Sequence, residues 1–206
     1  MPVINYKEKE LSCKIVYFGP SLGGKTTNIM WVHKQLPQPR RSDLQQVSTE
    51  GDRTLFFDFF SLNMSAVKGL RVSFQVYTVP GQQHYVSTRR MVLNGVDGLV
   101  FVADSDARRY ADNIESLMDL KSLLQEYGYD FSSIPLVLQY NKRDLADATP
   151  VEKLEEVLNE RKVPSFEAVA LEGKGVIPTF KTICSRVVTS INEVLAQPKD
   201  YYRQPS

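Results

Sequence analysis

The chain has 206 residues, enough for one domain with a substantial buried core. Its content of 42% hydrophobic and 24% charged residues is typical of globular proteins, and 25 Lys and Arg against 24 Asp and Glu leave no excess charge to favour nucleic acid or an anionic membrane. Two cysteines, Cys13 and Cys184, are too few for a disulfide framework, so we expect core residues and a reducing compartment. The sequence contains no signal-peptide pattern, membrane-length apolar stretch or prenylation cysteine, which predicts a cytoplasmic protein.

Hydrophobic patterning predicts six strands that alternate with helices. The expected strands are residues 13–18, 54–63, 70–79, 98–104, 136–141 and 166–170, and the clearest helices are residues 25–35, 111–127, 150–161 and 178–195. Such alternation is typical of a mostly parallel α/β sheet covered on both faces, and the wholly apolar run at 98–104 fits a strand buried on both sides. Residues 64–69 are too few for a crossover helix, so the strands that they join should form an antiparallel hairpin at one edge.

The segment at residues 19–26 reads GPSLGGKT and fits the phosphate-binding pattern GxxxxGK[ST] directly after an apolar strand. Glycines let the backbone wrap an anion with its N–H groups inward, and the following helix adds the positive end of its dipole. Lys25 then reaches the β- and γ-phosphates, and the Thr26 hydroxyl binds Mg²⁺. The nucleotide contacts expected here are Gly19, Gly23, Gly24, Lys25, Thr26 and Thr27.

Residues 36–52 form a long polar segment between the first helix and the second strand. Loops of this length in compact domains are usually functional. We expect this one to fold over the γ-phosphate, because it leaves the helix that begins at the phosphate site. An ordinary surface loop is the alternative.

A second motif, NKxD, follows the predicted strand 136–141. The Asp144 carboxylate can accept hydrogen bonds from N1–H and the exocyclic amine of guanine, which adenine cannot donate in that arrangement. Asn141 can tie this segment to the phosphate loop, and the Lys142 stem can lie along the purine. Ligands of open α/β sheets collect at the carboxyl ends of strands, so the motif predicts GTP rather than ATP.

With these motifs, the chain resembles the Ras-like small GTPases of the P-loop NTPase fold, and among them the bacterial GTPases of gliding motility and cell polarity. The likeness is carried by GKTTN at 24–28, TEGDRTLFFDF at 49–59 and TVPGQ at 78–82, and it extends from about residue 6 to about residue 195. It implies one GTPase domain over 1–195, with a polar, disordered tail at 196–206. It also implies Mg²⁺-dependent GTP hydrolysis to GDP that is slow alone, a Roadblock-type, MglB-like activator, and polarity or motility effectors, with recruitment to a cell pole.

Three departures from the general pattern of the family are informative. Thr78 stands where most small GTPases have Asp, so a neutral hydroxyl or another carboxylate must serve near Mg²⁺. Ser21 and Leu22 are bulkier than the usual phosphate-loop residues and can crowd the site that a catalytic glutamine must enter. The usual Ser-Ala-Lys guanine loop is reduced, which leaves the N–H groups of Val169 and Ala170 as expected contacts to the guanine oxygen.

For hydrolysis, the resemblance and the chemistry indicate three residues. Gln82, after Gly81 at the nucleotide, would orient the attacking water, and Arg53 would act as an arginine finger in cis or remain a solvated surface residue. Thr54 would add a second hydroxyl to Mg²⁺ in the GTP state, with Thr49 as the competing candidate.

Partners would read the nucleotide state at the hairpin strand 54–63, which is rich in Phe56, Phe57, Phe59 and Phe60. Two other classes of protein share some of these features. A nucleotide-dependent kinase would have the GKT loop but no use for NKxD. A GTP-binding scaffold that does not hydrolyse GTP is consistent with Thr78 and Leu22, and only turnover separates it from a switch.

Overall fold

The structure is a computed structural model that describes residues 3–5, 7, 9–47, 57–67, 70–80 and 85–196. The strands are β1 (Val3–Asn5), β2 (Glu10–Phe18), β3 (Gln45–Val47), β4 (Phe57–Val67), β5 (Leu70–Thr78), β6 (Gly98–Asp104), β7 (Leu136–Asn141) and β8 (Ser165–Glu167). The helices are α1 (Lys25–Gln35), α2 (Val86–Leu93), α3 (Tyr110–Glu126), α4 (Val151–Leu158) and α5 (Val176–Ala196). None of these helices is long and apolar enough to cross a membrane.

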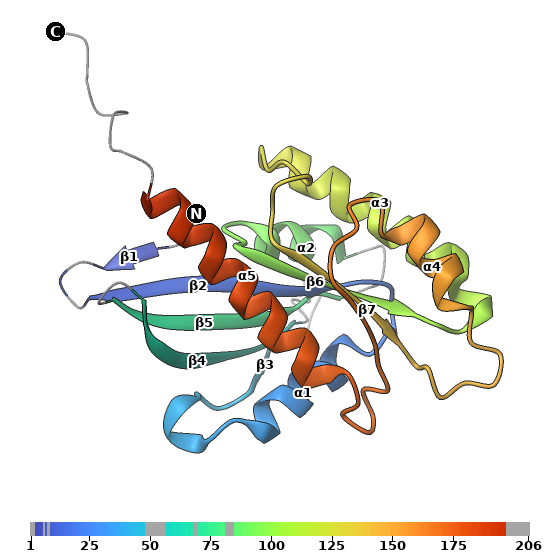
Figure 1. Cartoon of the computed structure of the whole chain (residues 1–206), viewed down its shortest axis with the longest axis horizontal. Coiled ribbons are helices and arrows are strands. Elements are labelled where there is room, and N and C mark those ends of the chain that lie inside the picture. Colours follow the sequence, from blue (N-terminus) through green and yellow to red (C-terminus); the bar gives the residue numbers. More distant parts are fainter. Residues whose placement is uncertain are drawn as a thin grey trace, which may run out of the picture.

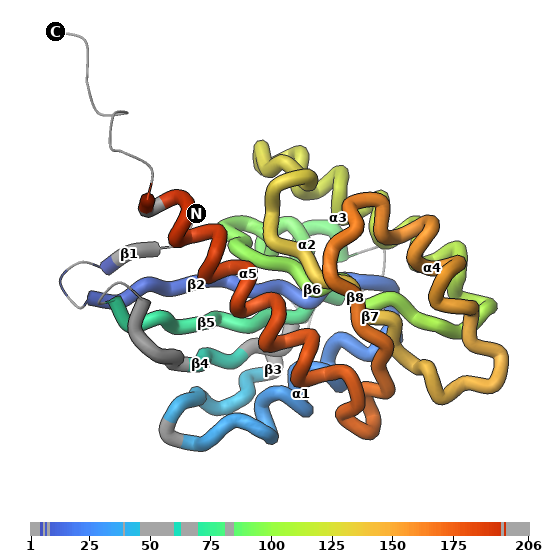
Figure 2. The backbone as a smooth tube through the Cα atoms, viewed as in Figure 1, coloured from blue at the N-terminus to red at the C-terminus, as the bar shows by residue number. Residues whose placement is uncertain are grey.

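All eight strands belong to one sheet, in the order β3-β4-β5-β2-β6-β7-β8, with β1 paired to the start of β2. Strands β5, β2, β6, β7 and β8 run parallel, whereas β4 is antiparallel to β5. The α/β fold class, the six predicted strands and the antiparallel hairpin are therefore confirmed. Figure 2 shows β8 as a short segment beside β7.

The sheet is covered on both faces, as the wholly buried strand β6 predicts. Alternate residues of β2 serve opposite faces: Ile15 and Tyr17 pack with α1 and α5, whereas Val16 packs with α2, α3 and α4. In Figure 1, α5 crosses the sheet diagonally. It approaches β6 closely at Gly98, where a Cβ atom would lie 2.4 Å from a methyl group of Val187. Cys13 of β2 and Cys184 of α5 are both buried in the same part of the core, as predicted.

The structure adds to the expected elements in two places and shortens one of them. The helix α2 was not predicted, because two of its buried positions hold the polar residues Thr88 and Arg89, which mask the apolar period. The last strand is shorter than predicted and ends at Glu167. The expected loop contains the strand β3, which pairs with residues 57–59 of β4. Residues 48–52 lie outside the described residues, so the expectation that this loop folds over the γ-phosphate stays a prediction.

The edge of the sheet is consequently β3, and the hairpin strand β4 is not the last strand on this side. The contact continues beyond β3, because the Ser42 amide donates to the Ser61 carbonyl at 2.9 Å and Arg41 forms a bridge with Leu62. Phe60 points into the core, 0% exposed, with its ring 5.4 Å from that of His33. The side chains of Phe57 and Phe59, and the whole of Phe56, lie outside the described residues.

Candidate functional site

A cavity of about 290 Å³ lies at the carboxyl ends of the central strands. Three segments far apart in the sequence form it: the phosphate loop, the NKxD tetrapeptide and the loop after β8. Its lining residues are Leu22, Gly24, Thr27, Asn141, Lys142, Asp144, Leu145, Val169, Ala170 and Leu171. The two motifs that the sequence placed apart therefore meet at one site, at the sheet edge where α/β proteins bind ligands.

Two glycines of the phosphate loop cannot be replaced without strain. Gly19 has φ +141, and a Cβ atom there would lie 2.2 Å from the Val102 carbonyl oxygen. Gly24 has φ +99, and its Cβ atom would lie 2.2 Å from the Asn141 side-chain nitrogen. Gly24 also caps α1, since its carbonyl oxygen accepts from the Asn28 amide at 3.0 Å. The loop thus turns tightly under β6 and leads directly into a helix N-terminus, as anion binding requires.

Lys25 lies buried inside this loop. Its ammonium donates to the carbonyl oxygens of Gly19 at 2.9 Å and Pro20 at 2.7 Å. Both contacts fix the ammonium next to the concave side of the loop, although the side chain is only 6% exposed. A phosphate group placed there would meet a cation whose burial makes the interaction stronger than in water.

Asn141 connects the three segments of the site. Its side-chain nitrogen donates to the Gly23 carbonyl at 2.8 Å, and its side-chain oxygen accepts from the Ala170 amide at 2.9 Å. The predicted tie between the NKxD segment and the phosphate loop is therefore present. The residue is 2% exposed, so both hydrogen bonds are shielded from water.

Lys142, which lines the cavity, forms an ion pair with the carboxylate of Asp104, a residue outside both sequence motifs. Its ammonium contacts Asp104 Oδ2 at 2.5 Å, and Asp104 is 1% exposed. The backbone of Lys142 adopts φ +65, in the left-handed region that an L residue rarely occupies. Because the charged head is fixed at Asp104, the stem is left to line the cavity, as expected for a residue that contacts a purine face.

The expected contacts of Val169 and Ala170 with the guanine oxygen are not supported. The Val169 amide donates to the Lys174 carbonyl at 3.1 Å, and the Ala170 amide donates to Asn141. Each backbone N–H supplies one hydrogen. Both residues line the cavity, so they contribute its shape rather than these hydrogen bonds. Asp144 is exposed and lines the cavity, and its role as the acceptor for the base stays a prediction.

The residues present fit a magnesium ion next to a nucleotide. Thr26 is the second residue of α1 and its side chain is exposed at the phosphate loop. A hydroxyl oxygen is a hard ligand of the kind that Mg²⁺ prefers, and this ion usually takes its other ligands from phosphates and water. Thr78, in place of the usual Asp, is buried at the end of β5.

The candidate catalytic residues lie outside the described part of the chain. This applies to Arg53, Thr54 and Gln82, to the alternative Thr49, and also to Gly81, which was expected to bind the nucleotide. Their roles stay predictions. Sequence reasoning also missed two residues that the structure brings to the site, Asp104 and Arg109. Asp104 had a usable signal, because it is the polar residue that ends an otherwise apolar central strand.

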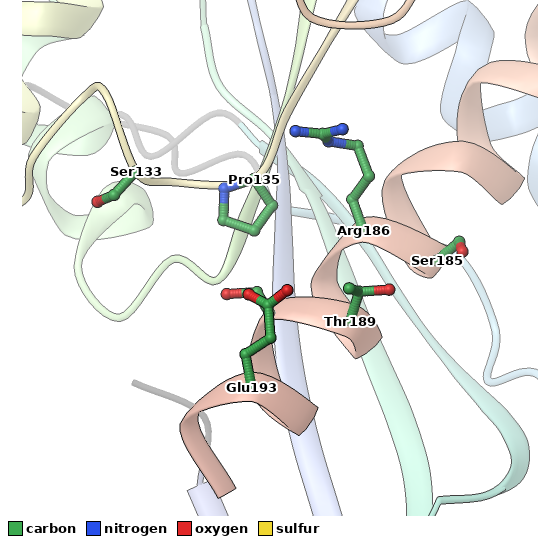
Figure 3. A pocket seen from close by; sticks show the side chains of 7 residues that line it. Ser133, Pro135, Ser185, Arg186, Thr189 and Glu193 are labelled. Atoms are coloured by element: carbon green, nitrogen blue, oxygen red, sulfur yellow. The ribbon is translucent and has the colours of Figure 1, made fainter. Parts of the chain in front are cut away.

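A second cavity, of about 320 Å³, lies at the opposite end of β7. Arg186, Thr189 and Glu193 project from α5 beside Pro135 there, as Figure 3 shows. Pro135 precedes β7, whereas Asn141 ends it, so this cavity is separate from the one that holds the sequence motifs.

Away from this cavity, the Arg108 side chain hydrogen bonds to the Asp106 carboxylate and lowers the pKa of that carboxyl to about 2.

The chain is similar in sequence to a known protein family and to several known proteins. The model of the ADP-ribosylation factor family matches residues 3–187. The chain is 47% identical over 193 residues to the mutual gliding-motility protein MglA of Myxococcus xanthus, which covers 94% of this chain and 99% of that protein. It is 26% identical to ADP-ribosylation factor-like protein 2 of Arabidopsis thaliana, over 90% of this chain and 92% of that protein. It is 25% identical to Ras-related protein Rab-7b of Homo sapiens, over 91% and 88%.

Proposed function

Because the chain belongs to the ADP-ribosylation factor family, a family of GTP-binding small GTPases, we propose that it is a Mg²⁺-dependent GTP/GDP switch of bacterial motility or cell polarity. The observation that carries the nucleotide assignment is the double contact of Asn141, which joins the phosphate loop to the guanine-binding segment around a single cavity. The proposal gives the Asp144 carboxylate to the base and the buried Lys25 ammonium to the phosphates, and the closeness of the phosphate loop to the NKxD segment supports it.

At the phosphate end of the site, the proposed ligand is a triphosphate. Lys25 and the loop amides bind the β- and γ-phosphates, and the Thr26 hydroxyl holds Mg²⁺, with Thr54 as a second ligand in the GTP state. When bound, the ion supplies positive charge that offsets charge developing on the phosphoryl oxygens. Gln82 orients the attacking water and Arg53 neutralises charge in cis. Hydrolysis is slow until a partner orders these residues.

Partners read the state of the nucleotide at the residues around 53 and those after 81, which differ between GTP and GDP forms. A Roadblock-type, MglB-like activator orders these residues without donating an arginine of its own. The adjacent sheet edge available to a partner is β3, since β3 already covers the outer side of β4. The protein works in the cytoplasm, with recruitment to a cell pole.

A GTP-binding scaffold that does not hydrolyse GTP is the second candidate, supported by Thr78 and by the exposed Leu22 beside the site. Phosphate release from GTP separates the two functions. We expect slow multiple turnover by the protein alone, faster turnover with the activator, and none with Lys25→Ala. Stable GTP binding without phosphate release, with or without the activator, would assign the scaffold function.

A further inference from the structure

Arg109 contacts the phosphate loop from outside both sequence motifs. Its Nη2 donates to the carbonyl oxygen of Ser21 at 3.0 Å, and its Nη1 pairs with the Asp112 carboxylate at 2.6 Å. It ends the 3₁₀ turn Ala107–Arg109 and directly precedes α3. We propose that Arg109 is a positioning residue for the nucleotide: by holding the Ser21 carbonyl, it aims the Leu22 amide at the phosphates.

The argument starts from the geometry of one peptide unit. The Ser21 carbonyl and the Leu22 amide belong to the same planar trans peptide, in which C=O and N–H point in opposite directions. A hydrogen bond that holds the carbonyl outward, toward the start of α3, therefore fixes the N–H toward the interior of the loop. That is the direction in which a phosphate loop presents its amides to an anion.

The backbone at Leu22 is strained, so this peptide needs a contact that holds it in place. Leu22 adopts φ +60, in the left-handed region that glycine reaches freely and that an L side chain disfavours. Its side chain is 83% exposed, so packing does little to offset the strain. Rotation of the peptide between Ser21 and Leu22 would relieve the strain and turn the N–H away from the phosphates. The charge-assisted hydrogen bond from Arg109 opposes that rotation.

The neighbouring carbonyls of the loop are held in the same manner by motif residues. Lys25 binds the carbonyl oxygens of Gly19 and Pro20, and Asn141 binds that of Gly23. Arg109 supplies the corresponding contact at Ser21. The inference rests on the nucleotide site proposed above and deepens it by adding a residue that shapes the loop before the ligand arrives.

A double-mutant cycle between Arg109 and Leu22 tests this role. The rates of release of a fluorescent GDP and a fluorescent GTP are measured for the parent, Arg109→Ala, Leu22→Gly and the double variant. Arg109→Ala should release both nucleotides about tenfold faster than the parent. In the Leu22→Gly background, the same change should raise the release rates by about threefold or less, because glycine adopts the required conformation without strain. Comparing ratios within each background removes the effect of losing the Leu22 side chain from the cavity wall.

Arg108→Ala is the matched control. Arg108 is the adjacent residue of the same turn, its side chain is 80% exposed, and it pairs with Asp106 rather than with the loop. It should leave both release rates unchanged. Asp112→Asn gives a second route to the same contact, since it loosens Arg109 without removing it, and should accelerate release by a smaller factor than Arg109→Ala.

If Arg109→Ala accelerates nucleotide release by the same factor in both backgrounds, or does not accelerate it at all, the positioning role is overturned. If it accelerates the release of GTP alone, Arg109 instead contacts the γ-phosphate directly. If the parent binds nucleotide and Lys25→Ala does not, such results count against Arg109 alone. If the parent binds neither GDP nor GTP, the proposed function itself fails.

Discussion

The side-chain amide of Asn141 donates to the Gly23 carbonyl at 2.8 Å, so a buried residue of the base-binding segment fixes the backbone of the phosphate loop. Replacing Asn141 with Ala removes this bond and the one from the Ala170 amide, and leaves two buried polar groups without partners. We expect GDP and GTP affinity to fall together by about 10- to 100-fold, equivalent to about 1.4–2.8 kcal/mol. Titration with each nucleotide measures the loss.

Asn159 provides the matched control for that variant. It is also a buried asparagine, and it hydrogen bonds to the Val163 backbone at the end of α4, away from the cavity. Asn159→Ala should lower the free energy of unfolding by about 1–3 kcal/mol without changing nucleotide affinity in the folded protein. Equal affinity loss in both variants would mean that Asn141 acts through general stability.

Asp144→Asn tests the choice of base. The new amide keeps an oxygen that can accept from N1–H, but it presents a donor where the exocyclic amine of guanine also donates, so GDP affinity should fall by about 100-fold or more. Xanthosine diphosphate has a carbonyl acceptor in place of that amine and should bind better than to the parent. Competition between the two nucleotides measures the switch. Unchanged GDP affinity would remove Asp144 from the site.

The catalytic assignments predict a separation of binding from chemistry. Gln82→Ala and Arg53→Ala should each keep GTP affinity within about tenfold while cutting activator-stimulated turnover by about 100-fold or more, because both act in the transition state. Thr54→Ala should instead weaken Mg²⁺-GTP relative to GDP. Single-turnover hydrolysis with the activator present tests these roles. If Arg53→Ala hydrolyses GTP at the parent rate, Arg53 is a solvated surface residue with no part in catalysis.

Burial of Cys13, with the negative charge of Asp97 as a smaller cause, raises the pKa of its thiol from 9.0 to about 12, and burial also raises the pKa of Cys184. The folded state therefore favours the neutral thiol at Cys13. Its contribution to stability is complete below about pH 9 and is lost as the pH rises toward 12. At pH 8, neither thiol should react with a disulfide reagent in the native protein, and both should react in guanidinium chloride. Rapid reaction of the native protein would contradict the burial of both cysteines in the core.

The sequence predicted the central strands and the two nucleotide motifs because each has a strong local signal. The strand Gly98–Asp104 is apolar throughout, and GKT and NKxD are fixed in residue type and spacing. The strand β3 has no such signal: two of its three residues are glutamine, and it is a strand through its pairing with β4. Likewise, Arg109 reaches Ser21 across 88 positions in sequence, a contact that depends on the tertiary fold.

The most direct test of the account is binding of GTP, GDP and ATP to the purified parent protein with Mg²⁺ present. The Asp144 carboxylate at the cavity matches the donor pair of the guanine edge, which adenine does not offer, so GTP and GDP should bind at least about 100-fold more tightly than ATP. Comparable affinity for ATP would contradict the guanine assignment of the NKxD segment, and with it the proposed switch.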